Sequence, residues 1–580
     1  MYRSSDFSRR VGLLLGSVFV IAALFIGRLV IIQVVDAEAL NAEAETHRTV
    51  TRVVYGVRGD VVDANGIVLA STVDRYDITA SPRYVVDFIR DDATVTVEQA
   101  LTEIAELTDT TVQELRAAVT KDPTADFAYL AKGVTITVLR EIQALGVPWV
   151  YYDLRPTRTY PRGAVGGNLV GFMGTDGALA GIELAKDSCL AATDGALTYA
   201  KGRDGIRIPG STVEQTSPVD GGTIHLTIDS DLQWFSQKVI SSRGKELGAQ
   251  WASALIVRIE DGHILAAADW PSVDPNNVNG SKVDDMGARL FSSPYEPGSV
   301  VKPLTVASML DQGLLTPTDR FTVPGRFNLD KGKYIADSFT HGTERWTTTG
   351  VLVYSSNIGM NVMAEELDKK ARYDILSSFG IGEKTSVNFL GEDSGYIATP
   401  DIVDDVTQHT EIFGQGITMT TAQIASAYQT LGNHGVRKPL TLISGCSRAD
   451  GSVVDRPPTD GVQVVSAEAA DQTVSMMETV ARDGYLRTLV DVEGYRVAVK
   501  SGTAEVARNG VYTDDRITSV AGVAPAENPK FAIIVVFGMP KVERTSLAVA
   551  TSFAKLMGQA LKYYRVPPSS GKAEKLPIEW

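Results

Sequence analysis

The chain has 580 residues, 44% of them hydrophobic and 22% charged, a composition of folded domains rather than of disordered or low-complexity chains. Its 55 Lys and Arg residues against 70 Asp and Glu residues give a net charge of −15, which excludes an extensive basic surface for nucleic acid. With 2 cysteines and 6 scattered histidines, we exclude a disulfide-rich scaffold and a Cys-rich metal site, and we expect neither a metal nor a cofactor.

An apolar segment near the N-terminus predicts a membrane anchor. Val11–Gly27 is uncharged and would span about 26 Å as a helix, close to the roughly 30 Å hydrocarbon core of a bilayer. Arginines precede it, so we predict a cytoplasmic tail over 1–10, a single transmembrane anchor over 11–33 and an extracytoplasmic body. A cleaved signal peptide is the alternative, suggested by Ala37-Glu38-Ala39, but the run exceeds the roughly 7–15 residues of a signal's apolar core.

Residues 34–222 are predicted to form an elongated N-terminal module. Asn65-Gly66 lies between two apolar runs, which indicates a tight β-hairpin. Thr111-x-x-Glu114 fits the capping box of a helix whose apolar residues follow at helical spacing. The Gly- and Pro-containing stretch 205–222 is typical of a connection between domains.

Residues 223–566 are predicted to form a second domain. Asp261-Gly262 indicates another hairpin, and three apolar strand candidates and a helix follow near the C-terminus: Arg496–Val506, Ile517–Ala524, Phe531–Phe537 and a helix that contains Val549 and Phe553. Strands at both ends of this domain with helices between them indicate an α+β fold, one antiparallel sheet covered by helices. Residues 567–580 carry Pro-Pro-Ser-Ser and are predicted to be a flexible tail.

The two cysteines lie on either side of the predicted domain boundary. Cys189 precedes it and Cys446 follows it by a long stretch of chain. We therefore expect them in different domains, without a bridge between them.

Three short motifs carry candidate chemistry. The pattern Ser-x-x-Lys occurs at Ser242, Ser299, Ser552 and Ser569, Ser-x-Asn at Ser355 and Ser386, and Lys-[Ser/Thr]-Gly at Lys500. Among the four serines of the first pattern, Ser299 follows a Pro-Gly turn and opens an apolar helix. Lys302 then lies one turn further on the same helix face, so its amine can reach the Ser299 hydroxyl.

These residues have the chemistry to activate a serine nucleophile. Serine is a poor nucleophile until a base takes its proton, and a lysine with its ordinary pKa of about 10.4 is protonated at neutral pH. Burial and a second cation at Lys500 would lower the pKa of Lys302. We therefore predict Ser299 as the nucleophile and Lys302 as its base. Ser355 would relay protons to the leaving amine, and Asn357 would orient Lys302 and the substrate amide.

The third motif is predicted to lie on a strand beside the substrate. Ser501, Gly502 and Thr503 follow Lys500 and are candidate substrate-binding residues, with Gly502 allowing the substrate backbone to approach closely. The backbone N–H groups of Ser299 and Thr503 would form the oxyanion hole.

At these residues the sequence resembles the penicillin-binding proteins, which share the three motifs with serine β-lactamases. The order of Ser299, Ser355 and Lys500 fits, and Ser501 replaces the commoner threonine while keeping its hydroxyl. Further strings resemble the class B members of this family: Arg58-Gly59-Asp60, Gly181-Ile182-Glu183, Asp220-Gly221-Gly222, Trp270-Pro271-Ser272 and Phe413-Gly414-Gln415.

The resemblance implies a membrane-anchored peptidoglycan D,D-transpeptidase with an N-terminal pedestal or dimerisation-type module and a C-terminal transpeptidase domain. The D-Ala-D-Ala end of a stem peptide would acylate Ser299, and an amine of a neighbouring stem peptide would then accept the acyl group. Implied partners are stem peptides on lipid II-derived strands, a membrane-embedded polymerising glycosyltransferase of the SEDS type and divisome membrane proteins. β-Lactams would inhibit the enzyme by mimicking the donor.

Several alternatives stay open. A bifunctional class A enzyme would need a glycosyltransferase motif between residues 36 and 222, and a class A β-lactamase would need a Glu-x-x-Leu-Asn element; we find neither string. A sensor–transducer would need several membrane spans, and a catalytically silent divisome scaffold would not need the intact motifs. The single lobe before the catalytic domain and Gly171-Phe172-Met173-Gly174 resemble division-type rather than elongation-type enzymes.

Overall fold

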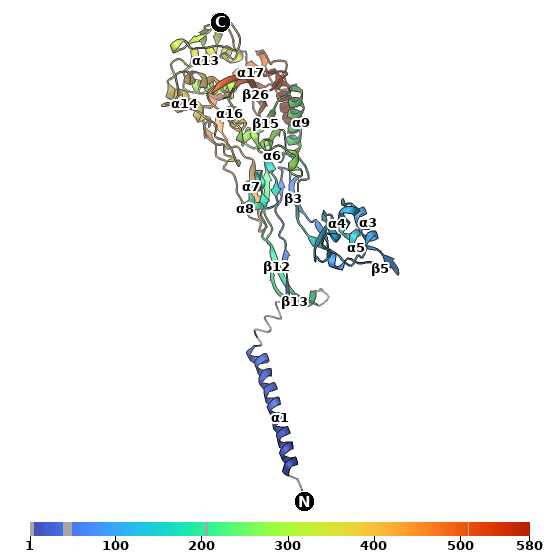
Figure 1. The fold of residues 1–580 in the computed structure, drawn as a ribbon. Coiled ribbons are helices and arrows are strands. Elements are labelled where there is room, and N and C mark those ends of the chain that lie inside the picture. The colour runs from blue at the N-terminus through green and yellow to red at the C-terminus, as the bar shows by residue number, and fades with distance from the viewer. Residues whose placement is uncertain (1–4, 37, 39–48, 203–206, 509) are drawn as a thin grey trace. The chain divides into compact units, whose positions relative to one another are not determined.

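A computed structural model describes residues 5–36, 38, 49–202, 207–508 and 510–580, and these residues mix helices and strands (Figure 1). The chain divides into two compact units. The first consists of Met1–Val57 and Ala192–Asp220, and the second of Arg58–Ala191 and Gly221–Trp580. The predicted α+β class is confirmed, with one apolar N-terminal helix and a sheet covered by helices.

The first unit begins with the apolar helix. Helix α1 (Ser5–Val30) continues into a π-helical turn, η1 (Ile31–Val35). The segment Phe7–Val35 has a mean hydropathy of 2.6 and none of its most apolar window is buried. A fully exposed apolar helix fits a single-pass membrane anchor, and the predicted span 11–33 lies inside it.

The first unit also contains a three-stranded antiparallel sheet in the order β1-β12-β13. Its strands are β1 (Thr49–Val54), β12 (Gly195–Lys201) and β13 (Arg207–Thr216). Strand β13 occupies most of the segment that we predicted to be a connection, whose residues 205 and 206 lie outside the described residues. The prediction was wrong because Gly210, with a φ of +76°, lies where the β12–β13 register shifts, so the irregular pairing accommodates the glycine.

Within the second unit, residues 76–154 fold around their own small core. Helices α3 (Val97–Leu107), α4 (Val112–Thr120) and α5 (Ile136–Ala144) accompany a sheet of β7 (Ala128–Val134), β4 (Tyr76–Ala80) and β8 (Val150–Leu154). The predicted capping box is confirmed: Glu114 N–H donates to the Thr111 hydroxyl, and the Glu114 carboxylate accepts from Thr111 N–H. Leu101, Ile104 and Trp149 are buried in this core.

A six-stranded sheet joins residues from both sides of the predicted boundary at 222/223. Its order is β23-β22-β14-β2-β3-β9, made of β23 (Val453–Val454), β22 (Ile443–Ser447), β14 (Thr223–Leu226), β2 (Val61–Val62), β3 (Val68–Val73) and β9 (Thr157–Thr159). The hairpin predicted at Asn65-Gly66 connects β2 and β3. Strand β14 pairs in parallel with β2 and antiparallel with β22. The boundary in the sequence is therefore not a boundary in the packing.

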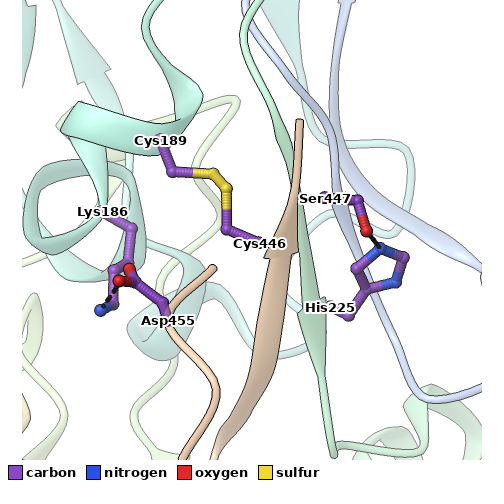
Figure 2. Close-up of a disulfide and its surroundings, with 6 residues drawn as sticks. All are labelled: Lys186, Cys189, His225, Cys446, Ser447 and Asp455. Atoms are coloured by element: carbon purple, nitrogen blue, oxygen red, sulfur yellow. Dashed lines mark hydrogen bonds and ion pairs between the residues drawn. A yellow bond between two sulfur atoms is a disulfide. The ribbon is translucent and has the colours of Figure 1, made fainter. Parts of the chain in front are cut away.

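A disulfide bond crosses the same boundary (Figure 2). Cys189, in the short helix α8 (Asp187–Leu190), is bonded to Cys446 on β22, with a Cα–Cα distance of 6.5 Å. Our prediction of unbridged cysteines was wrong. Cys446 pairs with Ile224 on β14, and Gly222 N–H, just before β14, donates to the Cys189 carbonyl at 2.7 Å. These contacts bring the two cysteines together across 257 positions, and the spacing of the cysteines in the sequence does not reveal them. An ion pair between Lys186 and Asp455 at 3.0 Å lies beside the bridge.

The five-stranded antiparallel sheet of the second unit has the order β16-β15-β27-β26-β25. Its strands are β15 (Trp251–Arg258), β16 (Ile264–Trp270), β25 (Ala498–Arg508), β26 (Val511–Ala524) and β27 (Phe531–Gly538), which confirms the three predicted strands and the Asp261-Gly262 hairpin. Ile534 and Val536 enter one buried cluster and Ile533, Val535 and Phe537 another, because successive side chains point to opposite faces.

Helices cover both faces of this sheet. Helices α9 (Ser230–Leu247) and α18 (Leu547–Tyr563) contribute to one cluster, and α11 (Lys302–Asp311), α16 (Thr421–Gly432) and most of α17 (Ala467–Asp483) to the other. Short elements lie between α11 and α16 in the chain: β17 (Arg320–Val323), β20 (Glu344–Thr347), α12 (Thr348–Val353), α13 (Asn357–Met363), α14 (Lys369–Ser378) and η7 (Glu411–Phe413). Of these, α12, α13 and η7 supply residues to the site described below.

The last residues differ from the predicted flexible tail over 567–580. Leu576 and Ile578 pack against the larger buried cluster, and Glu579 forms a β-bridge with Trp346 on β20. The alternating apolar residues Leu576, Ile578 and Trp580 form too short a pattern to predict a strand, and the segment is ordered by its contacts with the folded domain.

Candidate active site

A cavity of about 980 Å³ lies at the edge strand β25 and collects residues from all three motifs. Of the predicted residues, Ser299, Ser355, Asn357, Ser501 and Thr503 line it. Aromatic and apolar residues complete its walls, among them Phe339, Tyr354, Phe413, Tyr485 and Leu547. A volume of this size, with aromatic and apolar side chains and many converging polar groups, is typical of a small-molecule or peptide site.

Ser299 lies on a 3-10 turn, η5 (Gly298–Val301), that leads directly into α11. The predicted helix start is confirmed, with one tighter turn before the α-helix. Gly298 has a φ of +61° and donates its N–H to the carbonyl of Gly414 at 2.9 Å. Gly414 has no room for a side chain, because a Cβ there would lie 2.1 Å from the Gly298 carbonyl oxygen. Close contact between the two turns therefore fixes the backbone that carries Ser299.

Lys302 is fully buried at the start of α11. Burial lowers the pKa of its amine to about 7, although the charge of Asp337 opposes this shift. The amine donates to the Ser355 carbonyl oxygen and, at 3.4 Å, to the Ser355 hydroxyl, and it lies 5.9 Å from the centre of the Phe413 ring. A lysine with this pKa is partly neutral at pH 7 and can accept a proton.

Ser355 lies between two amines. Its hydroxyl accepts from Lys500 Nζ at 2.9 Å and from Lys302 Nζ at 3.4 Å. Its φ of +57° is unusual for a serine and places it at the sharp turn that follows α12. Burial, and then the charge of Lys302, hold the pKa of Lys500 well below its usual value. Two amines on one hydroxyl form a path along which a proton can move.

Asn357 lines the cavity, and its side-chain amide bonds the backbone rather than Lys302, which we predicted it to orient. Its contact with the substrate amide stays a prediction. Its Nδ2 donates to the carbonyl of Ala336 at 3.2 Å, and the hydrogen bonds described for Lys302 go to Ser355. The side chain is therefore held by the Ala336 carbonyl at the wall of the cavity.

Asp337 is the main residue that the sequence interpretation missed. Its fully buried carboxylate accepts four hydrogen bonds: from Ser356 Oγ at 2.5 Å, Asn357 N at 2.6 Å, Ile358 N at 2.9 Å and His341 Nε2 at 3.0 Å. These bonds cap α13 and hold the loop that carries Ser355 and Asn357. No sequence signal marks Asp337, because it lies in an irregular stretch and reaches the motif only through the fold.

Strand β25 presents alternate residues to the cavity. Ser501 and Thr503 line it, and the Tyr485 hydroxyl donates to Ser501 Oγ at 3.1 Å. Gly502 faces the other way: a Cβ there would lie 2.6 Å from Ser519 Oγ and 2.9 Å from the Pro297 carbonyl oxygen. We predicted that Gly502 lets a substrate approach. The structure instead uses the glycine to let the turn that carries Ser299 approach the strand.

The competing copies of the motifs lie elsewhere. Ser242 is on α9, Ser552 is on α18, and Ser569 accepts a hydrogen bond from Arg496 N–H in the segment after α18. Ser386 donates to the carbonyl of Leu440 beside a separate, smaller pocket. None of the four lines the cavity that contains Ser299.

Comparison with known proteins agrees with this geometry. Residues 252–558 match the model of the penicillin-binding protein transpeptidase domain, and residues 53–226 match that of the penicillin-binding protein dimerisation domain. The chain is 32% identical to penicillin-binding protein PbpB of Mycolicibacterium smegmatis, over 100% of this chain and 94% of that protein. It is 31% identical to the peptidoglycan D,D-transpeptidase FtsI of Escherichia coli K12, over 97% and 93% of the two chains.

Solved structures give the same result. A peptidoglycan synthetase from Bifidobacterium adolescentis has a TM-score of 0.72 and 32% identity and covers 92% of this chain and 100% of its own. Penicillin-binding protein 3 of Mycobacterium tuberculosis in complex with aztreonam has a TM-score of 0.70 and 26% identity over 91% and 100%. With a transpeptidase model over more than half of its length and motif residues gathered around one cavity, the chain belongs to the penicillin-binding proteins, as a transpeptidase with an N-terminal dimerisation domain.

Proposed function

We propose that this protein cross-links peptidoglycan stem peptides through an acyl-enzyme on Ser299, during septal wall synthesis. The observation that carries the proposal is the buried Lys302 amine, with a pKa of about 7, one turn after a cavity-lining serine. A base whose pKa is close to the working pH is what activation of a serine hydroxyl requires.

In the first step, the neutral Lys302 amine takes the proton of Ser299 Oγ, and the oxygen attacks the carbonyl carbon of the penultimate D-alanine. The negative charge on the carbonyl oxygen is stabilised by the backbone N–H groups of Ser299 and Thr503. The peptide C–N bond then breaks, and the leaving amine takes a proton from the Ser355 hydroxyl. Ser355 is reprotonated by Lys302 or Lys500, the two amines that contact its oxygen.

In the second step, an amine of a neighbouring stem peptide attacks the acyl-enzyme and releases Ser299. The same groups act in reverse, because the incoming amine must lose the proton that the leaving amine gained. β-Lactams would acylate Ser299 in the same way, but the leaving group stays attached to the acyl-enzyme after the ring opens.

We propose that the body lies outside the cytoplasmic membrane with residues 1–10 inside. Arg9 and Arg10 lie near the start of the segment Phe7–Val35 and directly precede its uncharged run Val11–Gly27, which favours a cytoplasmic N-terminus. The Cys189–Cys446 disulfide supports an oxidising compartment for the body. Nascent peptidoglycan is also cross-linked outside the membrane, so the substrate and the cavity would share a compartment.

Intact-mass spectrometry of the full chain in detergent tests the acyl-enzyme. After incubation with benzylpenicillin we expect an adduct of one drug mass that Ser299→Ala abolishes. Ser242→Ala, which removes an exposed serine of the same Ser-x-x-Lys pattern, should keep the adduct. If no adduct forms and the drug in solution stays intact, the protein would be a silent scaffold. If no adduct forms and the drug is hydrolysed, the protein would be a β-lactamase. Either result contradicts the proposal.

The septal role and the partners form a separate part of the proposal. One relative is named FtsI and is a D,D-transpeptidase, and the N-terminal dimerisation domain supplies a surface on which a SEDS-type polymerase and divisome proteins could bind. A fluorescently tagged chain should concentrate at the division site. A uniform distribution along the lateral wall would instead favour the elongation-type alternative.

A further inference from the structure

Residues Leu576–Trp580, called the docked segment below, bind beside the Ser355 loop. The segment is held to β20 by backbone hydrogen bonds: Thr347 N–H donates to the Ile578 carbonyl at 3.2 Å, and Trp580 N–H donates to the Arg345 carbonyl at 3.3 Å. The Thr347 hydroxyl donates to the Pro577 carbonyl at 2.6 Å. Together with the Trp346–Glu579 bridge, these bonds add the segment as a short strand to the edge of β20.

Specific side chains match the docked segment to its site. The Trp580 ring lies 5.4 Å from the Arg320 guanidinium and 5.3 Å from that of Arg345. Gly350 on α12 leaves room for the segment, because a Cβ there would lie 2.0 Å from the Ile578 carbonyl oxygen. A close backbone contact over a glycine, cation–π contacts and paired backbone groups indicate a specific docking site rather than an incidental contact.

The docked segment reaches the cavity through Tyr354. The Tyr354 hydroxyl donates to the Glu579 carboxylate at 2.5 Å, and the Tyr354 ring stacks on Trp346 with ring centres 4.8 Å apart and planes at 26°. Tyr354 lines the cavity and directly precedes Ser355, whose backbone is in the left-handed region. Tyr354 is therefore tied at its ring face to β20 and at its hydroxyl to the docked segment.

The state of the Tyr354 hydroxyl agrees with a donor role. Partial burial and the neighbouring Glu579 carboxylate raise the pKa of Tyr354 to about 12, so the phenol keeps its proton at neutral pH. A carboxylate acceptor makes this a charge-assisted hydrogen bond, which is stronger than one between neutral groups.

We propose that the docked segment is a positioning element of the active site that acts through Glu579 and Tyr354. It fixes one wall of the cavity and, through the residue next to it, the Ser355 turn. This role rests on the proposed acyl transfer by Ser299, because its effect is measured on that reaction.

The test measures the second-order rate of acylation of the full chain in detergent by a fluorescent penicillin. Glu579→Ala should slow acylation about two- to tenfold, the range expected for the loss of one hydrogen bond. Glu579→Gln, which keeps an acceptor oxygen, should largely restore the rate. Glu574→Ala is the matched control, because the Glu574 carboxylate accepts from Ser475 on α17 and belongs to the same stretch of chain without reaching Tyr354.

A double-mutant cycle separates positioning from general stability. Tyr354→Phe should slow acylation by a similar factor, and adding Glu579→Ala to Tyr354→Phe should cause no further loss, since the two residues act through one bond. Gly350→Ala leaves the Glu579 and Tyr354 side chains in the sequence, but its added Cβ would collide with the Ile578 carbonyl oxygen of the docked segment. This variant should therefore reproduce the effect of Glu579→Ala. Melting temperatures measured alongside verify that the variants are folded.

Three results decide between the explanations. If the wild type is acylated and Glu579→Ala and Gly350→Ala are acylated at the same rate, the positioning role is refuted and the proposed function stands. An additional loss from Glu579→Ala in the Tyr354→Phe background would also refute it, because the segment would then act by another route. A wild-type chain that takes no label would refute the proposed function and the positioning role with it.

Discussion

Removal of the Cys189–Cys446 disulfide should lower the stability of the unit that contains it. The bond closes a loop of 257 residues. The chain-entropy relation gives about 5.6 kcal/mol for a loop of that length at 25 °C. Removal of native disulfides costs about 2–5 kcal/mol in practice, because the unfolded chain keeps residual structure, so we expect about 3–5 kcal/mol.

The perturbation is the double variant Cys189→Ala/Cys446→Ala, which leaves no free thiol. Alanine is preferred to serine because both positions are buried, and a hydroxyl would lack a partner there. Urea titration, followed by tryptophan fluorescence, should show a lower midpoint for the double variant than for the oxidised wild type. Wild type treated with a reductant under denaturing conditions and refolded in its presence should match the variant.

Two outcomes would refute this reasoning. Equal midpoints for the oxidised wild type and the double variant would mean that the bond does not constrain the unfolded chain. Alkylation of two thiols in the unfolded, unreduced wild type would mean that the bond does not form. The reductant should not change the midpoint of the double variant, and a change would show that it acts on something other than the disulfide.

Four further predictions concern the cavity and the strand beside it. Lys302→Met should slow acylation by benzylpenicillin about 10²- to 10⁴-fold, the usual contribution of a general base, as measured by stopped-flow fluorescence. Because the neutral amine is the active form and its pKa is lowered to about 7, the wild-type acylation rate should rise with pH up to about 7 and then level off; a flat profile from pH 5 to 9 would contradict the assignment of Lys302. Asp337→Asn should lower both the melting temperature and the acylation rate, since at least one of its four donors loses an acceptor at a cost of about 1–3 kcal/mol, and an unchanged rate would exclude a role in holding the Ser355 loop. Gly502→Ala should destabilise the domain by about 1–3 kcal/mol through overpacking against Ser519 and Pro297, and a neutral effect in thermal unfolding would show that the turn can move away freely.

The sequence was sufficient where the signal is local. The hairpin at Asn65-Gly66, the capping box at Thr111 and the apolar strand predicted at Phe531–Phe537 all depend on neighbouring residues, and the structure contains all three. Ser299 and Ser355, which we chose among competing copies of their motifs, line one cavity in the structure, and Lys500, from the single copy of its motif, donates to the Ser355 hydroxyl. The roles of these residues in catalysis stay predictions.

What the sequence did not reveal depends on long-range contacts. Asp337 reaches the Ser355 loop through four hydrogen bonds that no spacing predicts. The disulfide depends on the pairing of β14 with β22, and the role of Gly502 depends on the proximity of the Ser299 turn. Docking of Leu576–Trp580 likewise depends on its close contact with Gly350, and only the folded domain brings these residues together.

The six-stranded sheet shared by the two sides of residue 222 limits how this architecture can be recombined. Exchange of the N-terminal module between relatives at that point would separate β2 from β14 and Cys189 from Cys446. Gly222 would also have to match, since a Cβ there would lie 2.9 Å and 3.0 Å from the two sulfur atoms. A functional chimera would therefore have to take the distant strand Ile443–Ser447 from the same parent protein as the N-terminal module. The segments that must be exchanged together are discontinuous in the sequence.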